Sequence, residues 1–257
     1  MTSLGEAAPD RTVFAVSGAD REAFLRGLVT NDLGKLRDGL VYAALLTPQG
    51  KYLADFFLVP GKDAILIDAK ADQADALIRR LSMYRLRAAV TIAATDLRVS
   101  RGLGPAPDGA MTDPRHPALG WRSYGAEPGA APGIDWDAIR VAHCIPESGI
   151  ELIPDETYIL EAGFDRLNGV DFRKGCYVGQ EVTARMKHKT ELRKGFLSVA
   201  IDGSAPVGTE ILSDGKPAGQ VFTQSEGRAI AWLRFDRIGD NMTAGDAHLH
   251  ALGPEGS

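Results

Sequence analysis

The segment Lys174–Gln180 reads KGCYVGQ and places a thiol between two glycines. Gly175 and Gly179 permit positive φ or a close approach of two backbones, which predicts a tight turn at Cys176. The residues QEVTARMKHK that follow have the length and composition of a short helix. A thiol at or just before a helix N-terminus is favoured as the thiolate, which is a nucleophile and a soft metal ligand.

The charge around this thiol is opposite in sign to that of the whole chain. The 257 residues carry a formal net charge of −5, whereas the segment from Arg173 to Lys194 holds seven Lys or Arg and two Glu. Lys174, Arg173 and Arg185 are cations that favour the ionised thiol. This local reversal suits an anionic ligand or an acidic partner.

The composition is that of an ordinary globular protein, with 44% hydrophobic and 25% charged residues. A pI near 5.6 gives no general attraction for nucleic acid or an anionic membrane. No apolar run approaches the roughly 20 residues that span a bilayer. The N-terminal residues MTSLGEAAPDRT have neither an apolar signal core nor an Arg-rich transit pattern, which predicts a cytoplasmic protein with reduced thiols.

The remaining metal-binding residue types are sparse. Cys144 lies in the apolar run VAHCI and is expected to be a small buried side chain. The two cysteines form no CxxC motif, and the five histidines are scattered. We therefore do not expect this chain alone to complete a metal site.

The first hundred residues alternate hairpins with helices. Strands are predicted at RTVFAVS, LVYAALLT, KYLADFFLV, AILIDA, RAAVTIAA and DLRVSRG. Helices are predicted at SGADREAFLRGLV, capped by Ser17 or Asp20, and at KADQADALIRRLSMYRL. This order predicts an α+β fold with helices on one face of a sheet.

The residue composition of the remaining chain changes at two points. Gly102–Gly133 is rich in glycine and proline and is expected to be loop around one strand, LGWRSY. DWDAIRVAHC is a predicted helix, and ETYILEAGFDRLNGV is helix or loop. From Gly195 onward, short β runs separated by Gly, Pro and Asp predict a small barrel or sandwich. No glycine motif for a nucleotide phosphate is present.

The run NGVDFRKGCYVGQEVTARM, Asn168 to Met186, resembles the signature of the YgfZ-type folate-binding proteins. These are bacterial iron–sulfur cluster maturation factors with a mitochondrial counterpart, and HKTELRK, which follows, is similar to the mitochondrial-type branch. The N-terminal runs SGADREAFLRGLVTNDL and ALLTPQGKYLADF resemble a wider superfamily that includes the glycine cleavage T protein, an aminomethyltransferase that uses tetrahydrofolate. The resemblance covers about residues 11 to 235.

The resemblance implies a fold and a division into domains. The expected fold is α+β, a three-part ring of two α+β lobes plus a C-terminal small β-barrel, with folate in a central channel. The expected domains are an N-terminal α+β folate-binding lobe at 1–100, a second lobe at 101–194 that ends in the KGCYVGQE segment, and the barrel at 195–257.

The resemblance also implies folate-contacting residues outside the signature. Asp55 matches the second aspartate of the GGxxDD motif of aminomethyltransferases, and Ala54 replaces the first. Trp136 stands where the YgfZ-type family places a tryptophan that stacks on the pterin ring. The glutamate that binds the pterin in much of the superfamily is replaced by Ala142, which removes a charged acceptor. Two nearby residues could compensate: His143 and Glu147.

Within the signature, Cys176 is the implied key thiolate. Because each iron needs about four ligands, one thiolate cannot hold a cluster, and a two-iron two-sulfur cluster shared with a partner, an A-type iron–sulfur carrier, is expected. The residues implied to bind the cofactor or shape its site are Lys174, Gly175, Tyr177, Gly179, Gln180, Glu181 and Arg185.

Three functions remain open at this point. The favoured one is a tetrahydrofolate-binding accessory factor for assembly or repair of iron–sulfur clusters in four-iron proteins, with an implied link to tRNA modification. The alternative is a folate-dependent aminomethyltransferase, or another one-carbon transfer enzyme, that uses Asp55. The third is a folate-binding sensor or scaffold in which Cys176 is structural. Nucleic acid and membranes are not expected as partners.

Overall fold

The computed structural model describes residues 5–189 and 191–252, with the side chain of Lys189 left aside. The chain forms two compact units. The first runs to Ile134 and resumes at Asp165–Val182; the second comprises Asp135–Phe164 and continues from Thr183. The domain boundaries predicted after residues 100 and 194 stay a prediction. None of the described helices is long and apolar enough to cross a membrane.

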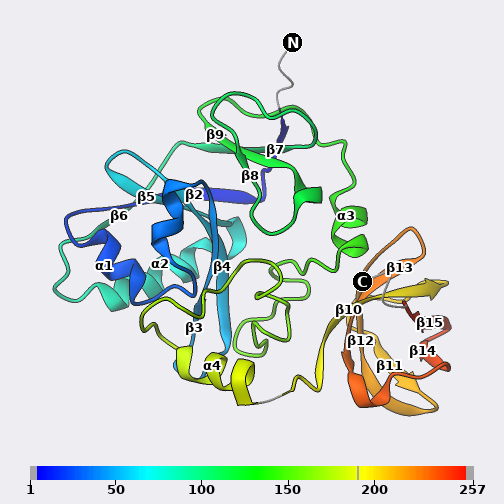
Figure 1. Cartoon of the computed structure of the whole chain (residues 1–257). Helices are drawn as coiled ribbons and strands as arrows, with labels where there is room; N and C mark the ends of the chain where they lie inside the picture. Colours follow the sequence, from blue (N-terminus) through cyan, green and yellow to red (C-terminus); the bar gives the residue numbers. More distant parts are fainter. Residues whose placement is uncertain (1–4, 190, 253–257) are drawn as a thin grey trace. The chain divides into compact units, whose positions relative to one another are not determined.

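The first unit is built on a five-stranded antiparallel sheet with the order β3-β4-β5-β2-β6. Its strands are β2 (Arg11–Ser17), β3 (Val41–Leu46), β4 (Tyr52–Pro60), β5 (Ala64–Lys70) and β6 (Thr91–Ala94). Three helical segments accompany it: α1 (Arg21–Arg26), the 3₁₀ helix η1 (Leu33–Arg37) and α2 (Ala71–Arg85). Figure 1 shows α1 and α2 lying along this sheet.

Period-2 alternation gives the sheet two different faces. Phe56 and Leu58 of β4 and Ile67 of β5 point into an apolar core that also contains Leu25 of α1 and Leu77 of α2. Both helices therefore cover one face, as the sequence predicted. The opposite face carries side chains of another kind, also buried: Tyr42, Asp55, Phe57 and Asp68.

A smaller sheet in the same unit has the order β1-β7-β9-β8. Its strands are β1 (Glu6–Ala7), β7 (Arg98–Gly102), β8 (Met111–Thr112) and β9 (Trp121–Gly125), and the 3₁₀ helix η2 (Pro117–Leu119) precedes β9. The segment expected to be loop around one strand thus contains β8 and η2 as well as the predicted strand.

The second unit is dominated by a closed six-stranded barrel with the order β10-β13-β12-β11-β14-β15. The strands are β10 (Lys194–Asp202), β11 (Glu210–Ser213), β12 (Lys216–Ser225), β13 (Arg228–Arg234), β14 (Met242–Ala244) and β15 (Ala247–Ala251), with the 3₁₀ helix η3 (Phe235–Arg237). Helix α3 (Trp136–Ala142) packs Val141 against Phe222 and Ile230 of the barrel. Helix α4 (Gln180–Lys189) passes from one unit to the other. The barrel confirms the predicted β-rich C-terminal part; β14 was not predicted.

The structure corrects one helix prediction. The helix expected over SGADREAFLRGLV is only the six residues of α1. Asp20, one of the two predicted caps, stands at its N-cap position, but its side chain makes no capping hydrogen bond; Ser17 ends β2. The Asp20 carboxylate instead accepts a hydrogen bond of 2.7 Å from the backbone N–H of Ala89, in the segment that leads to β6. A tertiary contact has replaced the local cap.

Candidate functional site

Cys176 is exposed on a loop of the first unit. Helix α4 begins at Gln180, four residues later. The predicted contribution of the helix dipole to the thiolate stays a prediction. What the loop provides is a thiol held outward between two fixed points.

Lys174 is the first fixed point. Its side chain is buried, and Nζ donates hydrogen bonds of 2.8 Å and 2.9 Å to the carbonyl oxygens of Arg26 and Val29, at the end of α1. The same ammonium lies 4.5 Å from the ring centre of Tyr177. Burial lowers the pKa of Lys174 to about 8, and the field of Asp32 opposes that shift. Lys174 thus binds the loop to α1.

Gly179 is the second fixed point. Its φ of +84° lies in the left-handed region, and a Cβ there would lie 2.5 Å from the carbonyl oxygen of Thr47 and 3.2 Å from the Cα of Gly50. The turn before α4 therefore packs backbone against backbone on the β3–β4 hairpin. Gly175 differs, since it has no positive φ and a Cβ would have nothing within 4 Å. The prediction of a positive φ or a close backbone approach is confirmed at Gly179 and wrong at Gly175.

The segment Thr30–Asn31 joins this loop to the sheet. The Thr30 hydroxyl donates to the carbonyl of Gly169 (2.7 Å), and its oxygen accepts from the N–H of Ala44 (2.8 Å). The Asn31 amide donates to the carbonyls of Tyr42 (2.8 Å) and Asn168 (2.7 Å). Both side chains are buried. Two sequence runs that carried the family resemblance separately are therefore one hydrogen-bonded structure, which sequence reasoning missed.

The other signature residues lie at the start of α4. Tyr177 is buried, and its N–H donates a hydrogen bond of 3.3 Å to the side-chain oxygen of Gln180. Glu181 and Arg185 are exposed on α4. Arg185 belongs to the second unit, whereas Cys176 belongs to the first.

Asp55 lies on β4, on the sheet face opposite the helices, and is buried. Its carboxylate accepts hydrogen bonds from the hydroxyls of Tyr42 (3.0 Å) and Tyr52 (2.7 Å). Burial, with Asp55 as the next cause, raises the pKa of Tyr42 well above its ordinary value, so that hydroxyl stays a donor. Ala54 packs in the apolar core under the helices. A carboxylate at that position would have pointed away from Asp55.

A buried charged network continues along the same sheet face, and the sequence did not predict it. Asp68 accepts from Arg11 (2.6 Å), Arg122 (3.2 Å) and the Tyr124 hydroxyl (2.9 Å). Asp113 binds Arg115 (2.9 Å) and Arg122 (3.0 Å). Burial alone would raise the pKa of Asp113, but the two guanidinium groups outweigh it and hold that pKa well below its ordinary value. Four of these side chains come from Gly102–Gly133: two from the strand predicted there, Arg122 and Tyr124, and two from the part expected to be loop, Asp113 and Arg115.

Trp136 and Ala142 lie at the two ends of α3 in the second unit. Trp136 is buried. Arg140 of α3 is buried and donates hydrogen bonds to Glu151 (3.1 Å) and the hydroxyl of Thr223 (3.0 Å). Burial alone would lower the pKa of Arg140. The negative charge of Glu151, followed by those of Glu147 and Asp137, outweighs burial and raises this pKa above its ordinary value. Arg140 therefore fixes α3 to β12. Trp136 belongs to the second unit and Asp55 to the first.

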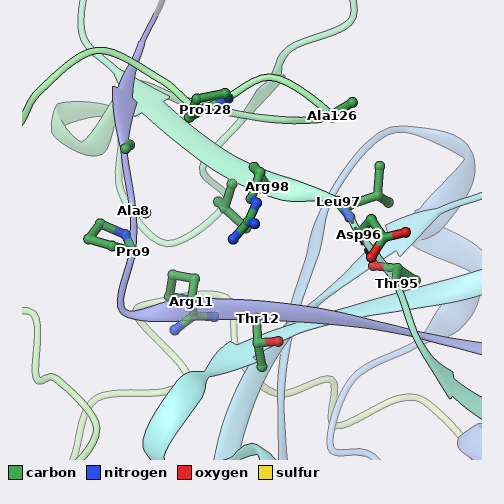
Figure 2. A pocket seen from close by; sticks show the side chains of 12 residues that line it. Ala8, Pro9, Arg11, Thr12, Thr95, Asp96, Leu97, Arg98, Ala126 and Pro128 are labelled. Atoms are coloured by element: carbon green, nitrogen blue, oxygen red, sulfur yellow. Dashed lines mark hydrogen bonds between the residues drawn. The ribbon is translucent and has the colours of Figure 1, made fainter.

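A cavity of the first unit lies elsewhere. It has a volume of about 440 Å³, and Asp96 and Arg98 are among the residues around it (Figure 2). Neither Asp55 nor Cys176 lines it. Among the residues that the structure describes, no group of three or more His, Cys, Asp or Glu is placed to hold a metal ion.

Comparison of the fold defines the class of protein. Residues 193–256 match the family model for the C-terminal β-barrel domain of CAF17. The fold is similar to that of glycine cleavage system aminomethyltransferase T from Bartonella henselae, with a TM-score of 0.72 at 14% identity over 98% of this chain and 86% of that one. The chain therefore has the aminomethyltransferase-type fold with a C-terminal barrel, as predicted.

Comparison of the sequence is more specific. The chain is 30% identical to the human mitochondrial iron–sulfur cluster assembly factor IBA57, over 94% of this chain and 79% of that protein. The mouse protein of the same name is 30% identical over 89% and 76%. The Neurospora crassa homologue is 33% identical over 80% and 55%. The chain belongs to the IBA57 family of iron–sulfur cluster assembly factors.

The match spans only 55% of the Neurospora crassa relative and 58% of the Mycosarcoma maydis relative. The relatives are named as mitochondrial proteins, which contradicts the cytoplasmic location predicted from the sequence. That prediction rested on the absence of a signal or transit pattern in the N-terminal residues. The absence of a pattern does not identify a compartment.

Proposed function

We propose that this protein acts in iron–sulfur cluster assembly and supplies Cys176 as a thiolate ligand to a cluster shared with a carrier protein. The observation that carries the proposal is the exposed thiol of Cys176 on a loop fixed by Lys174 and Gly179. The relatives named as iron–sulfur cluster assembly factors support it. A fixed loop lowers the entropy cost of presenting one ligand to a partner.

The partner must complete the coordination. Each iron of a two-iron two-sulfur cluster takes about four ligands, two of them bridging sulfides, so Cys176 supplies one position and cysteines of the carrier supply the others. An A-type iron–sulfur carrier has the required chemistry. Iron binding removes the thiol proton outright, so the thiolate forms when the cluster arrives.

The test is cluster capture by the whole protein mixed with the A-type carrier encoded in the same genome. Wild type should form a mixed complex with the visible absorption of a two-iron two-sulfur cluster. Cys176→Ser should lose that absorption, whereas Cys144→Ser, a change at the buried cysteine, should keep it. An undiminished cluster in Cys176→Ser would refute the assigned role.

Tetrahydrofolate binding is a separate part of the proposal. The planar indole of Trp136 and the buried carboxylate of Asp55 are groups that bind a pterin ring and its nitrogens. Titration calorimetry with tetrahydrofolate should give saturable binding that Trp136→Leu and Asp55→Asn weaken and that Arg98→Ala leaves intact. Wild type that binds no tetrahydrofolate would remove this part and leave the cluster role standing.

One observation favours a second candidate, a folate-dependent aminomethyltransferase. Asp55 is a buried carboxylate whose two tyrosine partners position it as a group that could hold a cationic amine. That enzyme would turn over tetrahydrofolate with an amine donor, and Asp55→Asn would abolish turnover. Absence of turnover with amine donors would leave the assembly role alone.

A further inference from the structure

The outer side of α2 and the residues after it form an unusual surface. Its members, which we call the arginine surface, are Arg79, Arg80, Met83, Arg85, Leu86 and Arg87. Helix α2 buries Ala74, Leu77 and Leu81, and Arg79, Arg80 and Met83 lie on its other side. Arg85 is the last residue of the helix, and Leu86 and Arg87 follow it. All six side chains are exposed.

The charge of this surface is unbalanced. Within the part of the chain that the structure describes, none of its four arginines has an ion pair or a side-chain hydrogen bond. The flanking acids in the sequence are Asp75 and Asp96. In a chain with a formal net charge of −5, four unpaired guanidinium groups within nine residues make a strong local positive potential.

Its apolar members are the two most exposed large hydrophobic side chains in the described chain. Met83 is 68% exposed and Leu86 is 89% exposed. Leu86 also has a φ of +41°, a conformation that costs a non-glycine residue roughly 1–2 kcal/mol. A strained leucine that contacts almost nothing in its own chain points to a role outside it.

We infer that the arginine surface docks an acidic face of the carrier protein, an inference that rests on the proposed function. Guanidinium groups bind carboxylates in a two-pronged geometry, and Arg and Met are enriched in the cores of protein interfaces. All four cations are arginine and none is lysine, which favours geometric recognition of carboxylates over diffuse attraction to a charged sheet of lipid.

The position of the surface fits one partner that covers both it and Cys176. The segment after α2 contacts the N-terminal end of α1 through the hydrogen bond from Ala89 to Asp20, and Lys174 binds the C-terminal end of α1. The six residues of α1 span about 9 Å. Val178 of the Cys176 loop and Leu77 of α2 share one core. A standard interface, about 30 Å across, is more than three times as wide as this span of α1.

The experiment measures binding of the same A-type carrier to the whole protein by surface plasmon resonance at two salt concentrations. The double variant Arg85→Glu with Arg87→Glu should bind about ten-fold or more weakly, mainly through slower association, and should lose most of the salt dependence. Arg98→Glu, an exposed arginine on β7, should change affinity less than two-fold.

Leu86→Gly separates docking from folding. Glycine accepts the positive φ at no cost, so the variant should melt about 2–4 °C higher while binding the carrier several-fold more weakly. Unchanged affinity in the arginine double variant and in Leu86→Gly would overturn the docking inference, and cluster loss in Cys176→Ser would then still support the proposed function. A carrier that fails to bind wild type would overturn both. Wild type that binds vesicles containing 30% phosphatidylserine, but not the carrier, would assign the surface to a membrane instead.

Discussion

Substituting the two glycines that flank Cys176 tests how the loop is held. Gly179→Ala adds a methyl group to a residue with a φ of +84°, where the new Cβ would lie 2.5 Å from the Thr47 carbonyl oxygen and 3.0 Å from the Cβ of Leu46. Neither neighbour is the end of a flexible side chain, so relief requires movement of the β3–β4 hairpin. Gly175→Ala adds the same methyl group where nothing lies within 4 Å.

The expected cost follows from two effects. A left-handed φ costs a non-glycine residue about 1–2 kcal/mol, and overpacking against a rigid neighbour costs about 1–3 kcal/mol. Gly179→Ala should therefore lower the free energy of unfolding by about 3 kcal/mol. Gly175→Ala has no clash and a backbone that alanine accepts, so the change should stay within about 0.5 kcal/mol and fall on the stabilising side.

Unfolding of the whole protein in guanidinium chloride gives these free energies. Hydrogen exchange shows which part of the chain is destabilised. Because the chain has two compact units, the loss should appear in the transition of the first unit. In Gly179→Ala the amide of Gly50, which donates to Thr47 (2.9 Å), should exchange faster than in wild type. Equal costs at the two glycines, or a larger cost at Gly175, would refute the claim that Gly179 is the fixed point.

Three further predictions concern other groups. In the native protein a thiol reagent should modify Cys176 and leave Cys144 unmodified until unfolding; equal rates would contradict the assigned burial. The pKa of Lys174 is lowered to about 8, so the unfolded chain binds more protons between pH 8 and 10.5, and the stability of wild type relative to Lys174→Met should rise across that window; a flat difference would count against a buried ammonium. Asp113→Asn removes the carboxylate charge that pairs with the buried guanidinium groups of Arg115 and Arg122. It should lower the free energy of unfolding by about 3–5 kcal/mol at pH 7. Because the pKa of Asp113 is lowered, its stabilisation is present at neutral pH and lost in acid, so the variant should also be less sensitive to acid; an unchanged acid profile would refute that.

Local patterns predicted the elements of the fold well. The strand KYLADFFLV and the helix KADQADALIRRLSMYRL were predicted from short-range patterns, and the structure contains both, as β4 and α2. The helix over α1 was predicted too long at both ends, and the carboxylate of Asp20 at its N-cap position accepts from Ala89 instead of capping the helix. That contact joins residues 69 positions apart and leaves no local trace in the sequence.

The candidate site was predicted residue by residue but not as an arrangement. The resemblance pointed to the Thr30–Asp32 run and to the Cys176 segment separately, yet the bonds from Thr30 to Gly169 and from Asn31 to Asn168 cross more than 130 positions. The charged network around Asp68 was missed for the same reason. One signal was available: Asp68 is a charged residue inside the apolar strand AILIDA, and a buried carboxylate needs partners.

The contacts of Lys174 give it a different role from the one that its place in the motif suggests. A lysine two residues from a thiol reads as a group that activates it. In the structure Nζ donates to the carbonyls of Arg26 and Val29 and faces the ring of Tyr177, so its bonds hold the backbone of the loop. Lys174→Arg should then fail to replace it, because a planar guanidinium does not fit between two carbonyls placed for an ammonium. If Lys174→Arg captured clusters as well as wild type, the charge of Lys174, rather than its position, would be what the thiol needs.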